Sequence, residues 1–294
     1  MKKAAVCFVS FILIMFLSIN SVYAITTEDY ENIVKITKKL RKLSDRGKTE
    51  EIAKYYSDNY KSFDGYNKEE TLSIFQSAKE LYPDIKTKEV IEKVEPDDDI
   101  VRVYINETSY SKLDVKGKDA KYAVGNKIKG RMDSKAYYSM IYKKEGKDWK
   151  VIGDEIYSES TEIKYGEAID TEFNMEAPSS IKPNEEYTVK ISLKMPLKRF
   201  VVGSIGHDKI VYPPEKTYDP YRAINKSGIL ERVMIANKEG KNEYANSTFA
   251  FINPFVKIKK NNKDIDADKA VISGLGFYVK RINAQSKENK NLWK

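Results

Sequence analysis

The single histidine of the chain, His207, lies close to Ser204 and Asp208, which supply the other two side chains of a hydrolytic triad. A serine nucleophile needs an imidazole base that a carboxylate orients, and the three groups must converge on one point. Neighbours in a turn cannot reach that geometry without help from elsewhere in the fold. We therefore predict that Gly206-His207-Asp208 is a hairpin turn whose imidazole faces water.

Three aspartates, Asp264, Asp266 and Asp268, alternate like part of a calcium-binding loop. An EF-hand loop also needs a glycine at its sharp turn and a closing glutamate that binds the ion. The segment has neither, so a surface turn is predicted instead. With one histidine and one cysteine in 294 residues, the sequence predicts no metal site, no cofactor and no assigned catalytic residue.

Residues 1–24 have the organisation of a secretory signal peptide. Two lysines precede an apolar run at 4–17, and Val22 and Ala24 provide the small-residue spacing that signal peptidase recognises. The run is shorter than the roughly 20 residues that cross a bilayer as a helix. Cleavage would remove the only cysteine, Cys7, which lies too early in the run for a lipoprotein anchor. We expect export through the Sec route, to the periplasm or the extracellular space, without a remaining membrane anchor.

The net charge of +8 is dispersed along the chain, with lysines interleaved with glutamates, as in Lys48–Glu51 and Lys86–Glu89. This pattern favours a solvated, mixed-charge surface, and the alternative is a dedicated site for a polyanion such as an envelope polymer. Export argues against a nucleic-acid partner. The abundance of Lys, Ile, Asn and Tyr is typical of a bacterial protein from an AT-rich genome.

Helix signals come first in the expected mature chain. Thr26 with Asp29, and Asn67 with Glu70, have the spacing of helix N-terminal caps. An apolar stripe at helical spacing follows the first cap, at Ile33, Ile36, Leu40 and Leu43. Beyond Pro83 the period changes to two, which indicates antiparallel strands that are half-buried.

This order, together with the segments Tyr55–Gly65 and Asp148–Ile152, resembles the nuclear transport factor 2-like superfamily, which includes ketosteroid-isomerase-like proteins. The resemblance covers about residues 26–158 and implies an α+β domain at 25–158 in which a curved sheet wraps around helices to form a cone. Some members of that superfamily are isomerases, hydratases or cyclases and many only bind ligands, so the fold does not choose among these functions.

The resemblance implies that Tyr56, Phe63, Tyr104 and Tyr138 line a ligand cavity in the cone. It also makes Asp64 a candidate base, with a tyrosine as oxyanion donor, because enolisation needs both groups. The residues themselves favour another interpretation, in which Asp64 and Gly65 form a turn. Tyrosines at alternating strand positions are also more often packing residues than catalytic ones.

A second domain is expected at 166–283, after a polar boundary at 158–166. Seven short strands separated by turn residues predict an all-β sandwich, generically immunoglobulin-like but without the Cys-Trp-Cys pattern of that family. Residues 284–294 are expected to form a disordered tail, in which Trp293 has no assigned role.

We therefore expect a non-enzymatic exported protein that binds a small apolar ligand or a peptide in the cone, and a protein or envelope polymer through the sandwich. Two alternatives stay open. One is a structural or assembly protein that forms a homodimer through the sheet face. The other is an isomerase or hydratase that uses a pocket carboxylate and a tyrosine.

Overall fold

The computed structural model describes residues 25–116, 127–196, 198–213, 219–253, 271–285 and 293. The expected signal peptide with Cys7, and the aspartates Asp264, Asp266 and Asp268, lie outside these residues. Within the described ranges, no helix has the length and apolar character needed to cross a membrane.

Three α-helices begin the described chain: α2 (Thr27–Asp45), α3 (Thr49–Ala53) and α4 (Lys68–Leu81). Both predicted caps are confirmed. The Thr26 side chain accepts a hydrogen bond from the amide of Asp29, and Asn67 and Glu70 form a reciprocal capping box. These side chains satisfy amides that have no partner within the first helical turn. The predicted apolar stripe of α2 is buried.

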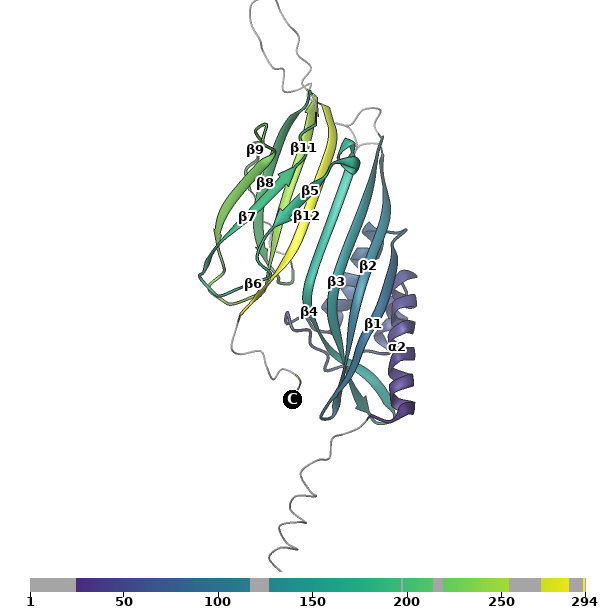
Figure 1. Ribbon diagram of the computed structural model, residues 1–294. Coiled ribbons are helices and arrows are strands. Elements are labelled where there is room, and N and C mark those ends of the chain that lie inside the picture. Colours follow the sequence, from purple (N-terminus) through teal and green to yellow (C-terminus); the bar gives the residue numbers. More distant parts are fainter. Residues whose placement is uncertain are drawn as a thin grey trace, which may run out of the picture.

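A single large sheet runs through both halves of the molecule (Figure 1), in the order β1-β2-β3-β4-β12-β11-β8-β9, with β6 beside β12. The strands are β1 (Lys86–Asp97), β2 (Ile100–Lys116), β3 (Lys127–Glu145), β4 (Asp148–Gly166), β6 (Ser180–Ile181), β8 (Phe200–Lys209), β9 (Arg222–Ala223), β11 (Glu243–Asn253) and β12 (Val271–Ala284). A smaller sheet has the order β10-β7-β5 and contains β5 (Phe173–Glu176), β7 (Glu186–Leu193) and β10 (Ile229–Ile235). A short 3-10 helix, η3 (Glu167–Asp170), follows β4.

The expected fold class, a helix-on-sheet cone followed by an independent sandwich, is wrong. The molecule is mostly β, and its large sheet belongs to both halves. The polar stretch at 158–166, expected to be a boundary, is part of β4 and pairs with β3 on one side and with β12 on the other. Nothing local reveals the second pairing, because β12 lies more than a hundred residues further along the chain.

Two cores lie on opposite faces of the large sheet. Side chains alternate between faces along a strand, so Met140 faces the helices while Lys135 of the same strand faces the other side. Lys135 is opposite Ser160 of β4, which is opposite Lys280 of β12. Ile282, two residues beyond Lys280, is therefore also on the side away from the helices, and it packs in the second core.

The two covering layers are consequently offset. The helices cover one face of β1–β4, and the three-stranded sheet covers the opposite face of β8, β11 and β12 (Figure 1). We call the side of β1–β4 that is turned away from the helices the outer face. Neither the helices nor the smaller sheet covers it, although a small cluster on this face, Ile100, Ile141 and Ile152, is buried.

A connecting segment at 55–63 borders the first half of β4. The amides of Ser57, Lys61 and Phe63 donate to carbonyl oxygens of β4 at 2.9, 3.0 and 2.8 Å, respectively. The segment forms isolated bridges rather than a regular strand. Thus β4 has this segment beside its first half and β12 beside its last residues.

Candidate functional site on the outer sheet face

Three tyrosines meet on the outer face: Tyr104 of β2, Tyr137 of β3 and Tyr157 of β4. Their ring centroids are 6.4 Å apart for Tyr104 and Tyr137, 6.0 Å for Tyr104 and Tyr157, and 5.4 Å for Tyr137 and Tyr157. Tyr157 lies at a bulge in β4, between the residues that pair with Tyr137 and Tyr138. A bulge redirects side chains, and here it brings the third ring to the outer face. We call these three residues the tyrosine cluster.

A groove of about 390 Å³ lies on the sheet over β1, β2 and β3. Strand alternation places six of its lining residues on the outer face with the tyrosine cluster, namely Lys86, Lys88, Thr108, Tyr110, Asp133 and Lys135. The row between them, Thr87, Ser109 and Ser134, points its side chains toward the helices and contributes backbone to the floor. We call this feature the lysine groove.

The lysine groove carries uncompensated positive charge. Its one carboxylate, Asp133, is paired with Arg131 at 2.6 Å. Within the described part of the chain, Lys86, Lys88 and Lys135 have no carboxylate within ion-pair distance. These lysines can therefore bind the anionic groups of a ligand without first breaking an ion pair within the protein.

The tyrosine cluster offers flat aromatic rings with hydroxyl groups at their edges. Burial, aided by a hydrogen bond with Glu95, raises the pKa of Tyr104, and burial raises the pKa of Tyr157 as well. The Lys93 ammonium lies 5.8 Å from the Tyr104 ring centroid and is paired with Glu95 at 2.7 Å. Such rings combine an apolar face with a polar edge, which suits contact with a partly polar ligand.

The structure does not bring the four residues predicted to line one cavity into a single site, although Tyr56 and Tyr138 share the helix-facing core. Tyr104 is on the outer face, whereas Tyr138 is on the helix face, where its hydroxyl donates to Glu107 at 3.1 Å. Tyr56 is buried in the helical core. Phe63 lies in the segment that borders β4. Strand alternation separates the two strand tyrosines, so Tyr104 alone contributes to the tyrosine cluster.

Carboxylates gather on the opposite, helix-facing side of the same strands. Glu89 of β1 and Glu107 of β2 are directly opposite one another. Burial, with a smaller contribution from the neighbouring charge of Glu107, raises the pKa of Glu89 to about 7. No group of three or more potential metal ligands occurs among the described residues. We interpret the pair as a cost to folding, because like charges directly opposite one another destabilise a sheet.

The histidine segment is a strand and not the predicted turn. Ser204, His207 and Asp208 all belong to β8, and alternation sends His207 to the face opposite the other two. The Ser204 hydroxyl donates to the Asp219 carbonyl at 3.2 Å. The glycine that suggested a turn, Gly206, instead makes room for Asp219, whose carboxylate would lie 1.9 Å from an added Cβ. The three side chains therefore cannot form a triad.

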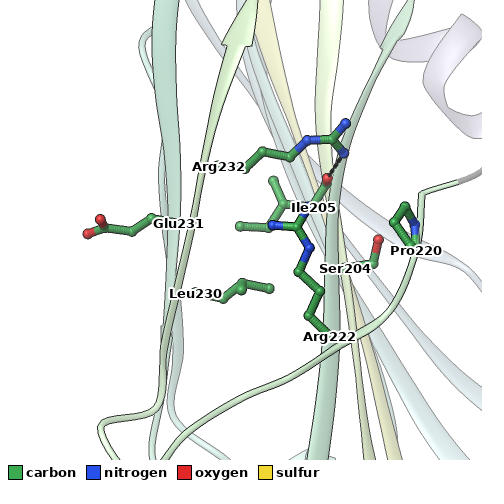
Figure 2. Close-up of a pocket in the computed structure, with 8 residues that line it drawn as sticks. Ser204, Ile205, Pro220, Arg222, Leu230, Glu231 and Arg232 are labelled. Atoms are coloured by element: carbon green, nitrogen blue, oxygen red, sulfur yellow. Dashed lines mark hydrogen bonds between the residues drawn. The ribbon is translucent and has the colours of Figure 1, made fainter.

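A small cavity beside β8 is shown in Figure 2. Its volume is about 10 Å³, and Ser204, Arg222 and Arg232 are among its lining residues. Arg232 donates to the Ile205 carbonyl and is paired with Asp219. A cavity of this size holds about one water molecule. It is too small for a ligand, so the lysine groove is the better candidate site.

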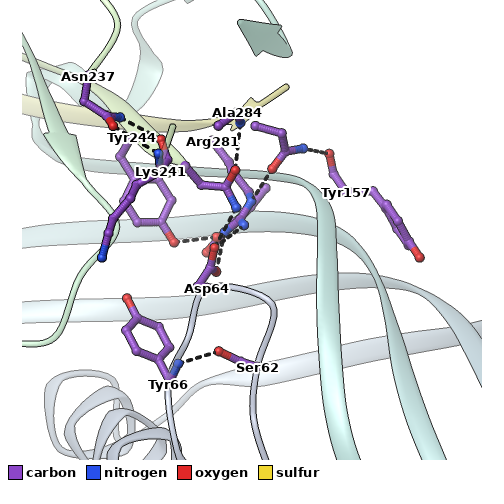
Figure 3. A network of polar contacts seen from close by, with 12 residues as sticks. Ser62, Asp64, Tyr66, Tyr157, Asn237, Lys241, Tyr244, Arg281 and Ala284 are labelled. Carbon is purple, nitrogen blue, oxygen red and sulfur yellow. Dashed lines mark hydrogen bonds and ion pairs between the residues drawn. The ribbon is translucent and has the colours of Figure 1, made fainter. Parts of the chain in front are cut away.

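Asp64 and Gly65 form a turn, as predicted, but the carboxylate is buried. Its Oδ2 accepts a hydrogen bond from Arg281 at 2.9 Å, and its Oδ1 accepts from Arg281 at 2.6 Å and from Asn242 at 2.7 Å (Figure 3). The side chains of Asp64 and Arg281 are 5% and 0% exposed. Because both oxygens are held by fixed donors, this carboxylate is not placed to take a proton from a substrate.

Sequence reasoning missed most of the outer-face residues. The alternation of β2 and β3 was visible, and it could have placed Tyr137 and Lys135 on the same face as Tyr104. It could not have placed Tyr157, because the bulge in β4 reverses the expected direction. In the sequence, Lys86, Lys88 and Lys135 belong to a dispersed charge pattern. Only the pairing of β1, β2 and β3 brings them to one surface.

Comparison with known proteins adds no family assignment. No family model matches the sequence, and no curated protein matches it. Among solved structures, one similar chain is that of Bdellovibrio bacteriovorus Bd1075, with 15% identity and a TM-score of 0.34. The match covers 44% of this chain and 40% of that chain. The resemblance to the nuclear transport factor 2-like superfamily stays a prediction, without the cone that it implied.

Proposed function

We propose that this protein is an exported, non-enzymatic binding protein that holds an extended anionic polymer of the bacterial envelope along the outer face of β1–β3. The observation that carries the proposal is the lysine groove, in which Lys86, Lys88 and Lys135 surround about 390 Å³ of open space. The groove is within the usual size range of ligand sites. The tyrosine cluster extends the same face beyond the groove.

The spacing of the lysines favours a polymer over a single small anion. Lys86 and Lys88 are two residues apart on one strand, which corresponds to about 7 Å, and Lys135 is two strands away from Lys88, which corresponds to about 10 Å. The charges are thus distributed rather than convergent. A chain with repeating carboxylate or phosphate groups could meet them in turn, while its uncharged units rest on the tyrosine rings.

Fluorescence anisotropy of labelled polymers tests this proposal. The mature chain would be titrated into oligogalacturonate, which carries carboxylates, into a glycerol-phosphate oligomer, and into a single-stranded DNA of equal charge. We expect one of these two repeating anionic polymers, the carboxylate chain or the phosphodiester chain, to bind more tightly than the DNA. Binding should weaken with added salt because surface charges are screened. Tightest binding to the DNA would contradict the proposed ligand class.

A double variant locates the site. Replacing Lys88 and Lys135 by glutamine should lower the affinity at least about tenfold, which corresponds to about 1.4 kcal/mol. The matched control is Lys182→Gln with Lys238→Gln, which removes the same charge from exposed positions away from the lysine groove. Equal losses in the two double variants would show attraction to net charge alone and would overturn the assignment of the groove.

A further inference from the structure

Trp293, next to the last residue of the chain, lies against the outer face near the start of β2. Its indole N–H donates to the Lys61 carbonyl at 3.0 Å. The Arg102 guanidinium is 5.3 Å from its ring, and the Phe63 ring centroid is 6.2 Å away. The expected disordered tail at 284–294 thus contains at least one residue with specific contacts, whereas 286–292 and 294 lie outside the described residues.

The surface beneath the indole is shaped for it. Ile100, Ile141 and Ile152 form a small apolar cluster on which Trp293 packs. At Gly153 an added Cβ would lie 2.0 Å from the indole nitrogen, so the absence of a side chain creates the space for the ring. The same Cβ would also lie 2.7 Å from the Lys61 carbonyl oxygen, which holds the indole N–H.

These contacts include each element of specific indole recognition. The isoleucines provide an apolar floor, Arg102 provides a cation beside the ring, and Lys61 provides an acceptor for the N–H group. Arg102 is itself held by an ion pair with Glu155 at 3.3 Å, and Glu155 accepts a hydrogen bond from Tyr157 at 3.1 Å. The site is therefore fixed by its neighbours rather than only by the tryptophan that occupies it.

We propose that Lys61, Phe63, Arg102 and Gly153 form an indole pocket that recognises a tryptophan side chain of a polypeptide partner, and that Trp293 of the same chain fills this pocket until a partner replaces it. An intramolecular occupant competes through its high effective concentration, which for a short tether is in the millimolar range. A partner therefore has to bind better than Trp293 does. The proposal does not depend on the lysine groove, which is formed by other residues.

The test uses a variant that empties the pocket. Trp293→Ala in the full mature chain would be titrated with the acetylated peptide Asn-Leu-Trp-Lys and followed by NMR at the amides of Arg102 and Gly153. We expect saturable shifts at both amides, and at least about tenfold weaker binding to the wild-type chain, whose pocket is filled. The same peptide with alanine in place of tryptophan should cause no shifts.

Two further measurements test the chemistry of the pocket. A peptide with 1-methyltryptophan cannot donate to the Lys61 carbonyl and should bind about threefold to tenfold more weakly, the range for loss of one neutral hydrogen bond. Adding Arg102→Gln to Trp293→Ala should also weaken binding, with circular dichroism as the check that this variant is folded. Absence of shifts in folded Trp293→Ala, or equal binding of the alanine peptide, would overturn the proposal. Lysine-groove variants should leave peptide binding unchanged.

Discussion

Asp64 and Arg281 form a bidentate ion pair although they are 217 residues apart in the chain. Asp64 follows the segment that borders the first half of β4, and Arg281 belongs to β12, which borders the second half. The pair therefore lies where these two neighbours of β4 meet, and it ties the helical half to the half with two packed sheets. Around it, Tyr244 donates to Glu159 at 2.7 Å and Asn283 donates to the Tyr157 carbonyl at 2.6 Å.

Removing one partner of this pair should strongly destabilise the fold. Arg281→Met leaves the Asp64 charge buried without its main donor, and loss of one partner from a buried pair costs about 3–5 kcal/mol. Urea unfolding measures the effect. Lys194→Met is the control, because Lys194 and Glu172 form a pair with 75% and 83% exposed side chains. A loss of stability no larger than in this control would contradict the role of the pair in joining the two halves of the molecule.

The stability of the protein should fall as the pH rises toward neutrality. The pKa of Glu89 is about 7 in the folded chain, against an ordinary value of 4.5, because burial disfavours its charged form. The folded state therefore binds more protons than the unfolded state between these pH values, and the free energy of unfolding decreases as pH increases through them. The pKa of Asp154, raised by burial to about 6, acts in the same direction.

Glu89→Gln tests this pH dependence, because glutamine keeps the shape of the side chain without its charge. At pH 8 the variant should be more stable than the wild type by about 1 kcal/mol, after allowance for solvent screening of a partly exposed group. Near pH 4.5 the two should be almost equal. Urea unfolding at both pH values measures this, with exposed Glu172→Gln as control. An unchanged pH profile would exclude Glu89 as its source.

The Tyr60 hydroxyl holds the Asp154 carboxylate. It donates to Asp154, and this hydrogen bond lowers the pKa that burial raises. Tyr60→Phe should therefore move the pKa of Asp154 above about 6 and destabilise the fold at pH 8 by about 1–3 kcal/mol, the cost of an unsatisfied buried acceptor. Carboxyl carbon NMR measures the pKa, with Tyr82→Phe as the control. A pKa that stays at about 6 would show that the hydroxyl has no such effect.

Variants of two tyrosines, one on β2 and one on β3, should affect polymer affinity and fold stability separately. Tyr104→Ala removes a ring from the tyrosine cluster and should weaken polymer binding several-fold, about 0.5–1.5 kcal/mol for an aromatic contact. Tyr138→Phe removes a hydroxyl on the helix face, where it donates to Glu107, and should change stability without changing affinity. Anisotropy and urea unfolding measure the two effects. If only Tyr138→Phe weakened binding, the ligand would lie on the helix face, which would contradict the proposed site.

Local signals in the sequence predicted the helix caps and the turn at Asp64 correctly, but the turn predicted at residues 206–208 is part of a strand. The caps at Thr26 and Asn67 are confirmed because a side-chain oxygen and the amides that it satisfies are three residues apart. The turn at Asp64 and Gly65 is confirmed for a similar reason, since Gly65 has a φ of 94° that other residues rarely adopt. The alternation along β2 was also visible in the sequence.

Tertiary structure decided what those elements do together. Backbone hydrogen bonds between strands carry little sequence information, so the pairing of β4 with β12 could not be inferred from either segment. That pairing, and the bulge at Tyr157, determine which side chains share the outer face. Likewise, the sequence showed Asp64 and Trp293, but Arg281 and Gly153 became their partners only through contacts between residues far apart in the chain.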